Sequence, residues 1–348
     1  MNRKVRAAVI GVGRAGDLPA ERGGGFKIGY VHATNYRAHP EVELVAGADV
    51  NEENLAAWRQ EFAVPGGYAD HRELLADARP ELVSICTYVG LHARMLEDCA
   101  RAGVGTIFCE KPFLAAPAEL ELVRGLLAET GVKVAVAHIR RYQPIFRRMR
   151  ELVQAGAIGR PLLYSASLPG WDLSEWGTHW FDIFRFFNDD APVEWVMGQA
   201  RVREERAYGH ATEQHAVAYF SFAGGCKGLI DGGGDLAQPF PMILTGEDGE
   251  LRLVDNETLR IVDATGAREE RFPIAGAWDA MWGEAVDEVV AWARGGDEPT
   301  IGATNALQTA ELNLAAYLSA VERDRVDLPL ADLSLAEWPL EQLARAAA

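Results

Sequence analysis

The sequence of 348 residues has few cysteines and no pattern that would make them ligands. Cys86, Cys99, Cys109 and Cys226 include no C-x-x-C pair and no zinc-like spacing, which excludes a disulfide-rich scaffold and a structural zinc site. Most of them lie in apolar stretches, where a buried free thiol is the expected state. We therefore expect no bound metal, and a reduced, cytoplasmic compartment.

Long apolar runs and basic residues are also scarce. No run of about 20 apolar residues is present, and the N-terminal residues do not resemble a signal peptide, so we expect no membrane association. The 34 Lys and Arg residues face 51 Asp and Glu residues, which gives a net charge of −17. Because phosphate backbones repel a chain this acidic, nucleic acid is also excluded as a partner.

What is present indicates a globular protein of about two domains. In the first part, apolar runs rich in β-branched residues alternate with amphipathic stretches. The runs cover residues 5–10, 42–48, 82–86, 105–109 and 132–137. Strands that are apolar nearly throughout and alternate with helices are typical of right-handed βαβ units. We predict an α/β fold, with a doubly wound parallel sheet of Rossmann type over residues 1–137.

After residue 137 the pattern changes to consecutive strands. Strand-like segments follow one another between residues 193 and 262, separated by Gly-Gly or Asp-Gly turns. Two amphipathic helical patterns, 279–294 and 305–324, follow them. Successive strands with hairpin signals indicate antiparallel pairing. We therefore predict a second, α+β domain with a mostly antiparallel sheet over residues 138–348.

A glycine-rich turn, Gly11-Val12-Gly13-Arg14, directly follows the first predicted strand. Glycines at this place let the backbone approach a pyrophosphate, which rests on amide groups at a helix N-terminus. Residues 15–28 contain a proline and three consecutive glycines, so we interpret them as an insertion that splits the motif. Either Gly16 or Gly29 then takes the third glycine position; the alternative is a plain turn without a ligand.

The second predicted strand ends at Asp49. A carboxylate there can accept hydrogen bonds from both adenosine ribose hydroxyls and would repel a 2′-phosphate. We therefore expect NAD as the cofactor, with NADP less favoured. The alternative interpretation, compatible with this one, is that Asp49 caps the following helix.

A Glu110-Lys111-Pro112 segment follows the fifth predicted strand, at the end of the sheet where ligands bind in this architecture. Together with other motifs, it makes almost the whole chain resemble the Gfo/Idh/MocA family (glucose–fructose oxidoreductase/inositol dehydrogenase). The other motifs are Gly11-x-Gly13, Thr87-x-x-x-x-His92 and Gly177-Thr178-His179-Trp180-Phe181-Asp182.

The resemblance implies an NAD(P)-dependent oxidoreductase of sugars, cyclitols or glycosides. It also implies that the C-terminal sheet is large and open, and supports homodimers or homotetramers. Lys111 matches the lysine that contacts the reacting hydroxyl, and His179 matches the acid/base histidine. Glu110 matches a residue beside the nicotinamide ribose, and Thr87 and His92 match residues that line the same region.

The histidine lies in a predicted helix, where Glu175, His179 and Asp182 have the spacing of one helix face. A histidine can take up the hydroxyl proton near neutral pH as hydride leaves the alcohol, and a carboxylate one turn away can orient its ring. Relatives often carry Asp where this chain has Glu175. We predict a catalytic role for Glu175, or alternatively a capping arrangement with Asp172.

Substrate contacts are predicted for Arg141, Trp176 and Asp182. Arg141 could donate hydrogen bonds to hydroxyls, and the face of Trp176 suits the apolar side of a sugar ring. Two alternatives to the dehydrogenase stay open. One is a keto-sugar reductase or a redox-neutral enzyme with tightly held NAD; the other is a non-catalytic regulator that senses dinucleotides.

Overall fold

The computed structural model describes residues 3–14, 27–207, 210–234, 236 and 239–347. The chain forms two compact units, each assembled from separate stretches of sequence. Unit 1 comprises Met1–Phe113, Glu121–Ala137 and Asp279–Ala303, and unit 2 comprises Leu114–Leu120, His138–Trp278 and Thr304–Ala348. One break between the units falls at the predicted domain boundary, residues 137 and 138. The division into whole domains at that point stays a prediction.

Unit 1 is built on a six-stranded parallel sheet with the order β3-β2-β1-β4-β5-β6. Its strands are β1 (Val5–Ile10), β2 (Val42–Ala48), β3 (Gly66–Tyr68), β4 (Leu82–Ile85), β5 (Thr106–Cys109) and β6 (Lys133–Val136). Strands β1, β4 and β5 are almost completely buried, as expected of a sheet covered on both faces. The strand order reverses between β1 and β4, and ligands bind at the carboxyl ends of strands at such a point.

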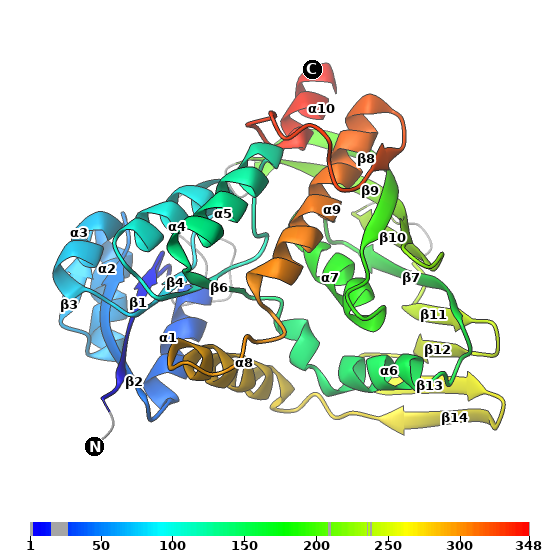
Figure 1. Ribbon diagram of the computed structural model, residues 1–348, viewed down its shortest axis with the longest axis horizontal. Helices are drawn as coiled ribbons and strands as arrows, with labels where there is room; N and C mark the ends of the chain where they lie inside the picture. Colours follow the sequence, from blue (N-terminus) through cyan, green and yellow to red (C-terminus); the bar gives the residue numbers. More distant parts are fainter. Residues whose placement is uncertain (1–2, 15–26, 208–209, 235, 237–238, 348) are drawn as a thin grey trace. The chain divides into compact units, whose positions relative to one another are not determined.

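The helices of unit 1 cover both faces of this sheet. They are α1 (Ile28–Ala38), α2 (Glu52–Phe62), α3 (His71–Ala78), the 3₁₀ turn η1 (Val89–Leu91), α4 (His92–Arg101), α5 (Pro117–Thr130) and α8 (Ala277–Ala293). Figure 1 shows α4 and α5 on one face and α1 and α8 on the other. Helix α8 reaches the sheet through Trp282, whose ring centroid lies 4.8 Å from that of His32 in α1 and 6.0 Å from that of Phe108 in β5.

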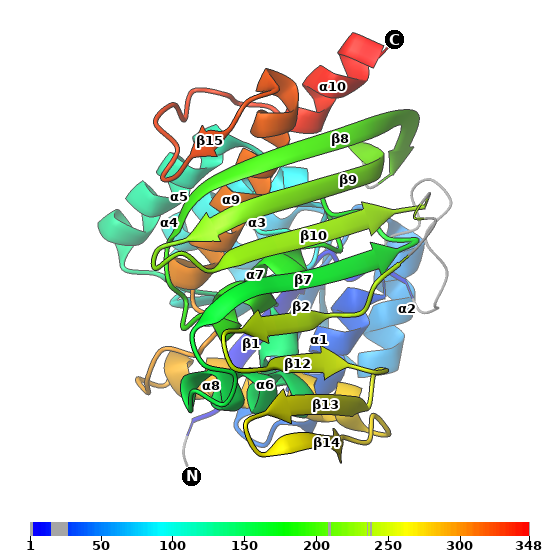
Figure 2. The same cartoon turned by 90° about the vertical axis from the view of Figure 1, so that its right-hand side faces the viewer.

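Unit 2 is built on a nine-stranded sheet with the order β14-β13-β12-β11-β7-β10-β9-β8-β15, which Figure 2 shows face-on. Its strands are β7 (Pro161–Pro169), β8 (Val193–Ala207), β9 (His210–Phe222), β10 (Lys227–Gly233), β11 (Ile243–Gly246), β12 (Glu250–Leu253), β13 (Thr258–Asp263), β14 (Gly266–Arg271) and β15 (Val326–Asp327). Strands β7 and β10 pair in parallel and the other pairs are antiparallel.

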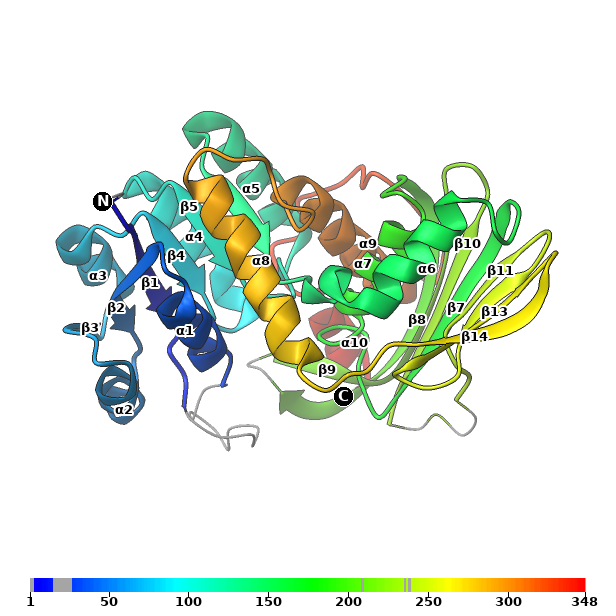
Figure 3. The same cartoon turned by 90° about the horizontal axis from the view of Figure 1, so that it is seen from below.

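The helices of unit 2 are η2 (Ile139–Tyr142), α6 (Pro144–Gln154), α7 (Thr178–Phe187), α9 (Ala303–Glu322) and α10 (Pro339–Ala347). Helices α6, α7 and α9 lie on one face of the sheet (Figure 3). Phe184 of α7 contacts the ring of Phe220 in β9, so this face holds the core of the unit. On the opposite face the paired residues Met197 and Tyr219 are 51% and 37% exposed.

The predicted fold class is confirmed: a parallel Rossmann sheet in one unit and a mostly antiparallel sheet in the other. The strands β3, β14 and β15 and the helix α10 lie outside the segments that the sequence pattern predicts. A strand of two or three residues carries no periodic pattern, so only its pairing partner defines it. None of the described helices is long and apolar enough to cross a membrane.

Candidate active site

A pocket of about 200 Å³ lies in unit 1, at the carboxyl ends of β1, β2 and β4. It is lined by Ile10, Gly11, Gly13, Ala48, Asp49, Val50, Asn54, Ala69, His71, Cys86, Thr87, Tyr88, Leu91 and Met95. The lining is mostly apolar, with one carboxylate, Asp49, among a few polar side chains. It therefore combines the glycine turn with the carboxylate that follows β2, as the Rossmann prediction requires.

The glycine turn has backbone geometry and close contacts that require glycine. Gly11 has φ +80° and Gly13 has φ +64°. A Cβ on Gly11 would lie 2.8 Å from the Cys86 carbonyl oxygen, so no larger residue fits there. A Cβ on Gly29 would lie 2.5 Å from the Val12 carbonyl oxygen. Gly29 thus provides the close approach expected of the third glycine, whereas the other candidate, Gly16, lies outside the described residues.

Asp49 is held by backbone donors of the pocket. Its carboxylate accepts a hydrogen bond from the Gly13 amide at 2.9 Å and another from the Asn51 amide, also at 2.9 Å. The N-cap of α2 is Asn51, whose side chain accepts from the Asn54 amide. The interpretation of Asp49 as the helix cap is therefore wrong, while its place in the pocket is as predicted.

The other two residues of the turn are placed differently. Val12 is completely buried and is part of the core below the turn. Arg14 is the last residue described before the predicted insertion, and it is partly exposed. Neither side chain lines the pocket, so a contact with cofactor through Val12 or Arg14 stays a prediction. The backbone of Val12 lies within the turn itself, since its amide donates to the Ala48 carbonyl.

Glu110 lies at the end of β5, within a buried chain of hydrogen bonds that the sequence analysis missed. Its Oε1 lies 3.1 Å from His32 Nε2, and its Oε2 accepts from the Lys111 amide at 3.1 Å. His32 Nδ1 lies 2.8 Å from Ser84 Oγ, which in turn lies 2.7 Å from the Tyr36 hydroxyl. Two signals in the sequence could have found it: a polar Ser84 inside an apolar strand, and His32 and Tyr36 one turn apart on a helix.

Thr87 lies in the loop after β4 and His92 begins α4, and the two residues differ in their exposure to the pocket. Thr87 lines the pocket, as predicted. His92 is fully buried, with Nδ1 2.9 Å from the Pro112 carbonyl and Nε2 3.0 Å from the Thr87 carbonyl. Its ring therefore holds the Thr87 loop against the segment after Lys111. This position supports a structural role for His92 rather than direct contact with a cofactor.

In unit 2, His179 lies in the first turn of α7. It is buried, and its ring centroid lies 6.4 Å from that of His138 and 6.4 Å from that of Trp176. Phe184 and Phe187, on the same helix, pack in the core against Tyr164. The amphipathic pattern thus places His179 away from the aromatic core, beside a second histidine, His138.

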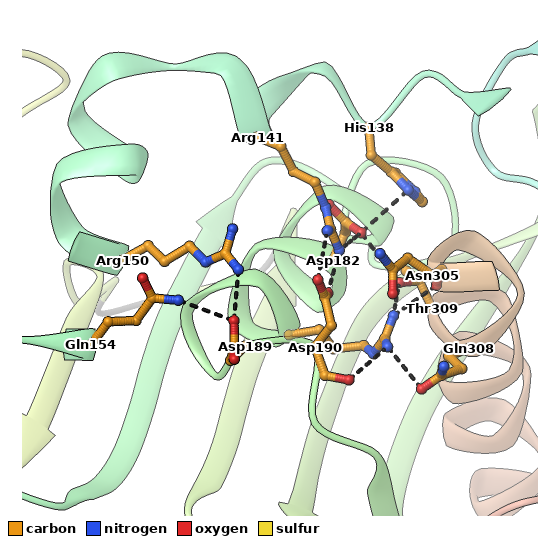
Figure 4. Close-up of polar contacts among 11 residues, drawn as sticks. His138, Arg141, Arg150, Gln154, Asp182, Asp189, Asp190, Asn305, Gln308 and Thr309 are labelled. Carbon is orange, nitrogen blue, oxygen red and sulfur yellow. Dashed lines mark hydrogen bonds and ion pairs between the residues drawn. The ribbon is translucent and has the colours of Figure 1, made fainter. Parts of the chain in front are cut away.

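Asp182 and Arg141 form a buried ion pair (Figure 4). Arg141 Nε and Nη2 donate to the two Asp182 oxygens, each at 2.8 Å, and the guanidinium also pairs with Asp190 at 2.7 Å. The pair is almost inaccessible, with 0% exposure for Arg141 and 1% for Asp182. The side chains predicted to contact substrate are therefore bound to each other, so we assign both to positioning of η2 and α7.

Burial and the neighbouring charges together set the pKa values of this buried network. Burial alone would raise the pKa of Asp182, but the charges of Arg141, His138 and Arg185 and the hydrogen bonds from Arg141 together outweigh burial, and the pKa is lowered. The carboxylate also lies 3.3 Å from His138 Nδ1, so it orients His138 rather than His179. Arg185 donates to the Thr309 hydroxyl and to Gln308, and burial lowers its pKa to about 10. The predicted carboxylate–histidine pairing thus exists with a different histidine.

Glu175 lies in the turn before α7, so it does not share a helical face with His179. Its carboxylate pairs with His210 Nε2 at 3.0 Å. Asp172 does cap this turn, accepting from the amides of Glu175 and Trp176 at 2.7 and 3.0 Å. The Trp176 ring packs at a tilt of 50° against that of Trp171, with centroids 4.4 Å apart, and its substrate role stays a prediction.

Arg140 differs from its neighbour Arg141. Its guanidinium stacks over the ring of Trp180 at 4.6 Å, and burial lowers its pKa to about 10. No described carboxylate pairs with it. Arg140 thus fits a hydrogen bond to a ligand better than Arg141 does. A grouping of His, Cys, Asp or Glu able to hold a metal ion is not found within the described residues.

Comparisons with known proteins agree with both units. The family model "Oxidoreductase family, NAD-binding Rossmann fold" matches residues 5–138, and the model of the Gfo/Idh/MocA C-terminal domain matches residues 146–252. The D-apiose dehydrogenase of Paraburkholderia graminis is 28% identical, with 88% of each chain covered. The myo-inositol 2-dehydrogenase of Thermotoga maritima is 26% identical, over 65% of this chain and 68% of the relative.

Solved structures share the fold. The WlbA dehydrogenase of Chromobacterium violaceum, in complex with NADH and UDP-GlcNAcA, superposes with a TM-score of 0.78 at 20% identity, covering 95% of this chain and 98% of that one. The two family models lie on the two parts of the chain that the sequence motifs separate. The chain belongs to the Gfo/Idh/MocA family of NAD-binding oxidoreductases.

Proposed function

We propose that this oxidoreductase is an NAD-dependent dehydrogenase of a polyhydroxylated substrate, a sugar, cyclitol or glycoside, in which Lys111 and His179 transfer the hydroxyl proton. The observation that carries the proposal is the position of Lys111. It follows β5 at the carboxyl edge of the same sheet whose β1, β2 and β4 ends form the pocket with Gly11 and Asp49. A cofactor on the glycine turn and a proton-transferring ammonium thus share one edge of one sheet.

The proposed chemistry assigns a separate task to each side chain. Oxidation of an alcohol removes a hydride from carbon and a proton from oxygen, and a bound nicotinamide supplies the hydride acceptor. The Lys111 ammonium donates a hydrogen bond to the reacting oxygen and favours its deprotonated form. His179 accepts the proton, as an imidazole does near neutral pH. Reduction of a ketone uses the same groups in the reverse direction.

The pocket favours NAD over NADP. Two backbone amides fix the Asp49 carboxylate at the pocket, where it can accept hydrogen bonds from ribose hydroxyls. A 2′-phosphate at that place would face a fixed negative charge. Val50, the next residue, is 90% exposed and apolar, and no Lys or Arg is among the pocket's lining residues. The charge at the pocket therefore supports NAD.

The substrate class rests on the relatives and on unit 2. The relatives named for D-apiose and myo-inositol act on polyhydroxylated compounds. In unit 2, His179 has Trp176 as a ring neighbour, and Arg140 stacks on Trp180, the residue after His179. Aromatic faces and a guanidinium are suited to sugar rings and hydroxyls. We propose Trp176 and Arg140 as substrate contacts, with Glu175 acting through His210.

The open face of the nine-stranded sheet supports a homodimer or homotetramer. Paired strands β8 and β9 present Met197 and Tyr219 on the face opposite to the helices, both well exposed. Exposed apolar side chains on a broad sheet face mark a protein–protein contact. We propose that a second copy of the chain covers this face.

The test is a panel of monosaccharides, cyclitols and glycosides with NAD and with NADP, for the wild type and Lys111→Ala. We expect NAD-dependent oxidation of at least one compound, a loss of about 10²–10⁴-fold in kcat for the variant, and unchanged NADH binding by fluorescence. Full activity of Lys111→Ala would overturn the assignment. Nicotinamide absorbance that survives dialysis would favour tightly held NAD, and NADH binding without any turnover would favour a regulator.

A further inference from the structure

A chain of buried hydrogen bonds connects α1, β4 and the end of β5 in unit 1. The Tyr36 hydroxyl lies 2.7 Å from Ser84 Oγ, and Ser84 Oγ lies 2.8 Å from His32 Nδ1. His32 Nε2 lies 3.1 Å from Glu110 Oε1, and Glu110 Oε2 accepts from the Lys111 amide at 3.1 Å. The chain therefore begins on a helix next to the glycine turn and ends at the backbone of the proposed proton donor.

The partners determine which atom donates at each step. A carboxylate only accepts hydrogen bonds, so His32 Nε2 carries a proton and donates it to Glu110. In the neutral imidazole Nδ1 then accepts, and the only hydrogen of Ser84 is directed to it. Since the Ser84 hydrogen is used, the Tyr36 hydroxyl donates to Ser84 Oγ. This single order satisfies all these donors and acceptors with His32 uncharged.

The series of hydrogen bonds ends inside the protein at Tyr36. Tyr36, Ser84 and His32 are each 0% exposed. Burial raises the pKa of Tyr36, so its hydroxyl keeps its proton. Burial, and then the charge of Glu110, raise the pKa of Cys86 and Cys109, so the thiols near Glu110 are neutral. A chain with no exit to solvent and no second charged partner cannot conduct a proton, but it can hold a carboxylate in place.

Aromatic side chains fix the orientation of the His32 ring. Its centroid lies 4.7 Å from that of Phe108 and 4.8 Å from that of Trp282. With the ring fixed by packing and Nδ1 fixed by Ser84, the Nε2 proton has one direction, toward Glu110. Such preorganisation is what a site needs to keep reacting groups within a fraction of an ångström.

We infer that His32 is a positioning residue: through Nε2–H it fixes the Glu110 carboxylate, which in turn holds the Lys111 backbone in its reactive place. The inference rests on the proposed function of Lys111. It assigns a task to a helix residue that neither touches the proposed reacting atoms nor lines the pocket. Ser84 and Tyr36 act in the same way, with weaker influence as the chain lengthens.

Two substitutions of His32 distinguish the contribution of Nε2 from that of Nδ1. His32→Gln places an amide NH₂ near the position of Nε2 and can still donate to Glu110. His32→Asn places its amide near Nδ1 and reaches only Ser84. Ser84→Ala and Tyr36→Phe each remove one hydroxyl and change the packing least. His39→Asn is the control, because His39 follows the same helix and pairs with Asp287, outside the buried chain.

We expect His32→Asn to lower kcat by about 10–100-fold, with His32→Gln recovering most of the loss. Ser84→Ala should have a smaller effect and Tyr36→Phe the smallest, while KM for the substrate and the control variant change little. The measurements are kcat and KM on the best compound of the panel, the Kd for NADH, and thermal melting. Histidine ¹⁵N NMR of the wild type should show His32 as the neutral Nε2–H tautomer.

Equal activity of the Asn and Gln variants, whether retained or lost, would overturn the inference, because the Nε2 donor would then not be the determinant. An effect of Tyr36→Phe as large as that of His32→Asn would also overturn it, as would a charged His32. If wild type binds NADH but oxidises no compound, the proposed function fails separately. The tautomer, and a weaker NADH Kd in His32→Asn than in His32→Gln, then decide the inference by themselves.

Discussion

Two carboxylates of unit 1, Asp49 and Glu110, are held differently from Asp182 of unit 2. In unit 1, Asp49 accepts from two backbone amides, and Glu110 pairs with His32 and accepts from the Lys111 amide. In unit 2, Asp182 is held by the charged guanidinium of Arg141 and is 1% exposed. The backbone amides leave the Asp49 carboxylate at the pocket. The Arg141 guanidinium instead binds the Asp182 carboxylate within the core.

This difference indicates which carboxylates are available for chemistry. A neutral donor orients a carboxylate and leaves its charge to act on a ligand. A buried guanidinium neutralises it, and the pair then acts as one structural element whose separation costs much more than its formation gains. We therefore expect changes in unit 1 to alter cofactor and substrate kinetics, and changes in the ion pair of unit 2 to alter stability.

The largest effect is expected for Asp182→Ala. It leaves Arg141 buried against only Asp190, so the free energy of unfolding should fall by about 3–5 kcal/mol. Urea denaturation measures the loss. The matched control is Asp189→Ala, because Asp189 pairs with Arg150 at 2.7 Å while its side chain is 72% exposed; its loss should stay below about 1 kcal/mol. Equal losses of stability in the two variants would show that the buried ion pair contributes no more than the exposed one.

Gly29→Ala should have the next largest effect. The new Cβ would lie 2.5 Å from the Val12 carbonyl, which forces α1 away from the glycine turn. We expect a loss of about 1–3 kcal/mol in stability, accompanied by weaker NADH binding in calorimetry. Gly125→Ala is the control: Gly125 lies within α5 and a Cβ there meets nothing within 4 Å. That variant should be as stable as wild type or more so.

Asp49→Ser tests whether a carboxylate held by neutral donors acts on a ligand. Removing the charge should move the ratio of kcat/KM for NAD over NADP by about tenfold toward NADP, equivalent to about 1.4 kcal/mol. Stability should change little, because the serine hydroxyl can still accept from a backbone amide. Asp70→Ser is a control outside the pocket lining. An unchanged ratio would mean that Asp49 does not contact the ribose.

The smallest effect is expected on the stability difference between wild type and Asp182→Asn when the pH is lowered. Because the folded pKa of Asp182 is lowered, its contribution to stability is present above the ordinary pKa of an aspartate and is lost as pH falls below it. Between pH 6 and about pH 4 the stability gap between wild type and Asp182→Asn should therefore narrow by less than ~1 kcal/mol, and further acidification should narrow it more. A gap that widens on acidification would contradict the assignment.

Much of unit 1 could be predicted from the sequence because local patterns determine it. The alternation of apolar runs and amphipathic stretches predicts the parallel sheet, and Gly11 and Gly13 have the positive φ angles that their position requires. The family motifs identified an oxidoreductase of the Gfo/Idh/MocA type, which the comparisons confirm. The roles of Lys111 and His179 stay predictions.

The partners of side chains could not be predicted. Spacing alone placed Glu175 and Asp182 with His179, yet Glu175 pairs with His210 on β9 and Asp182 with Arg141 and His138. These partners come from other elements, so no helical period can indicate them. The same limit explains why the role of His32 was missed.

By itself, then, the sequence determined the fold class, the glycine turn, the carboxylate after β2 and the family. Each depends on neighbours within a few residues or on a motif of fixed spacing. The tertiary structure decided that Gly29 packs closely on the turn, which histidine Asp182 orients, and that Glu110 is held by His32. Those contacts join residues far apart in the chain, and only packing brings their polar atoms within hydrogen-bond distance.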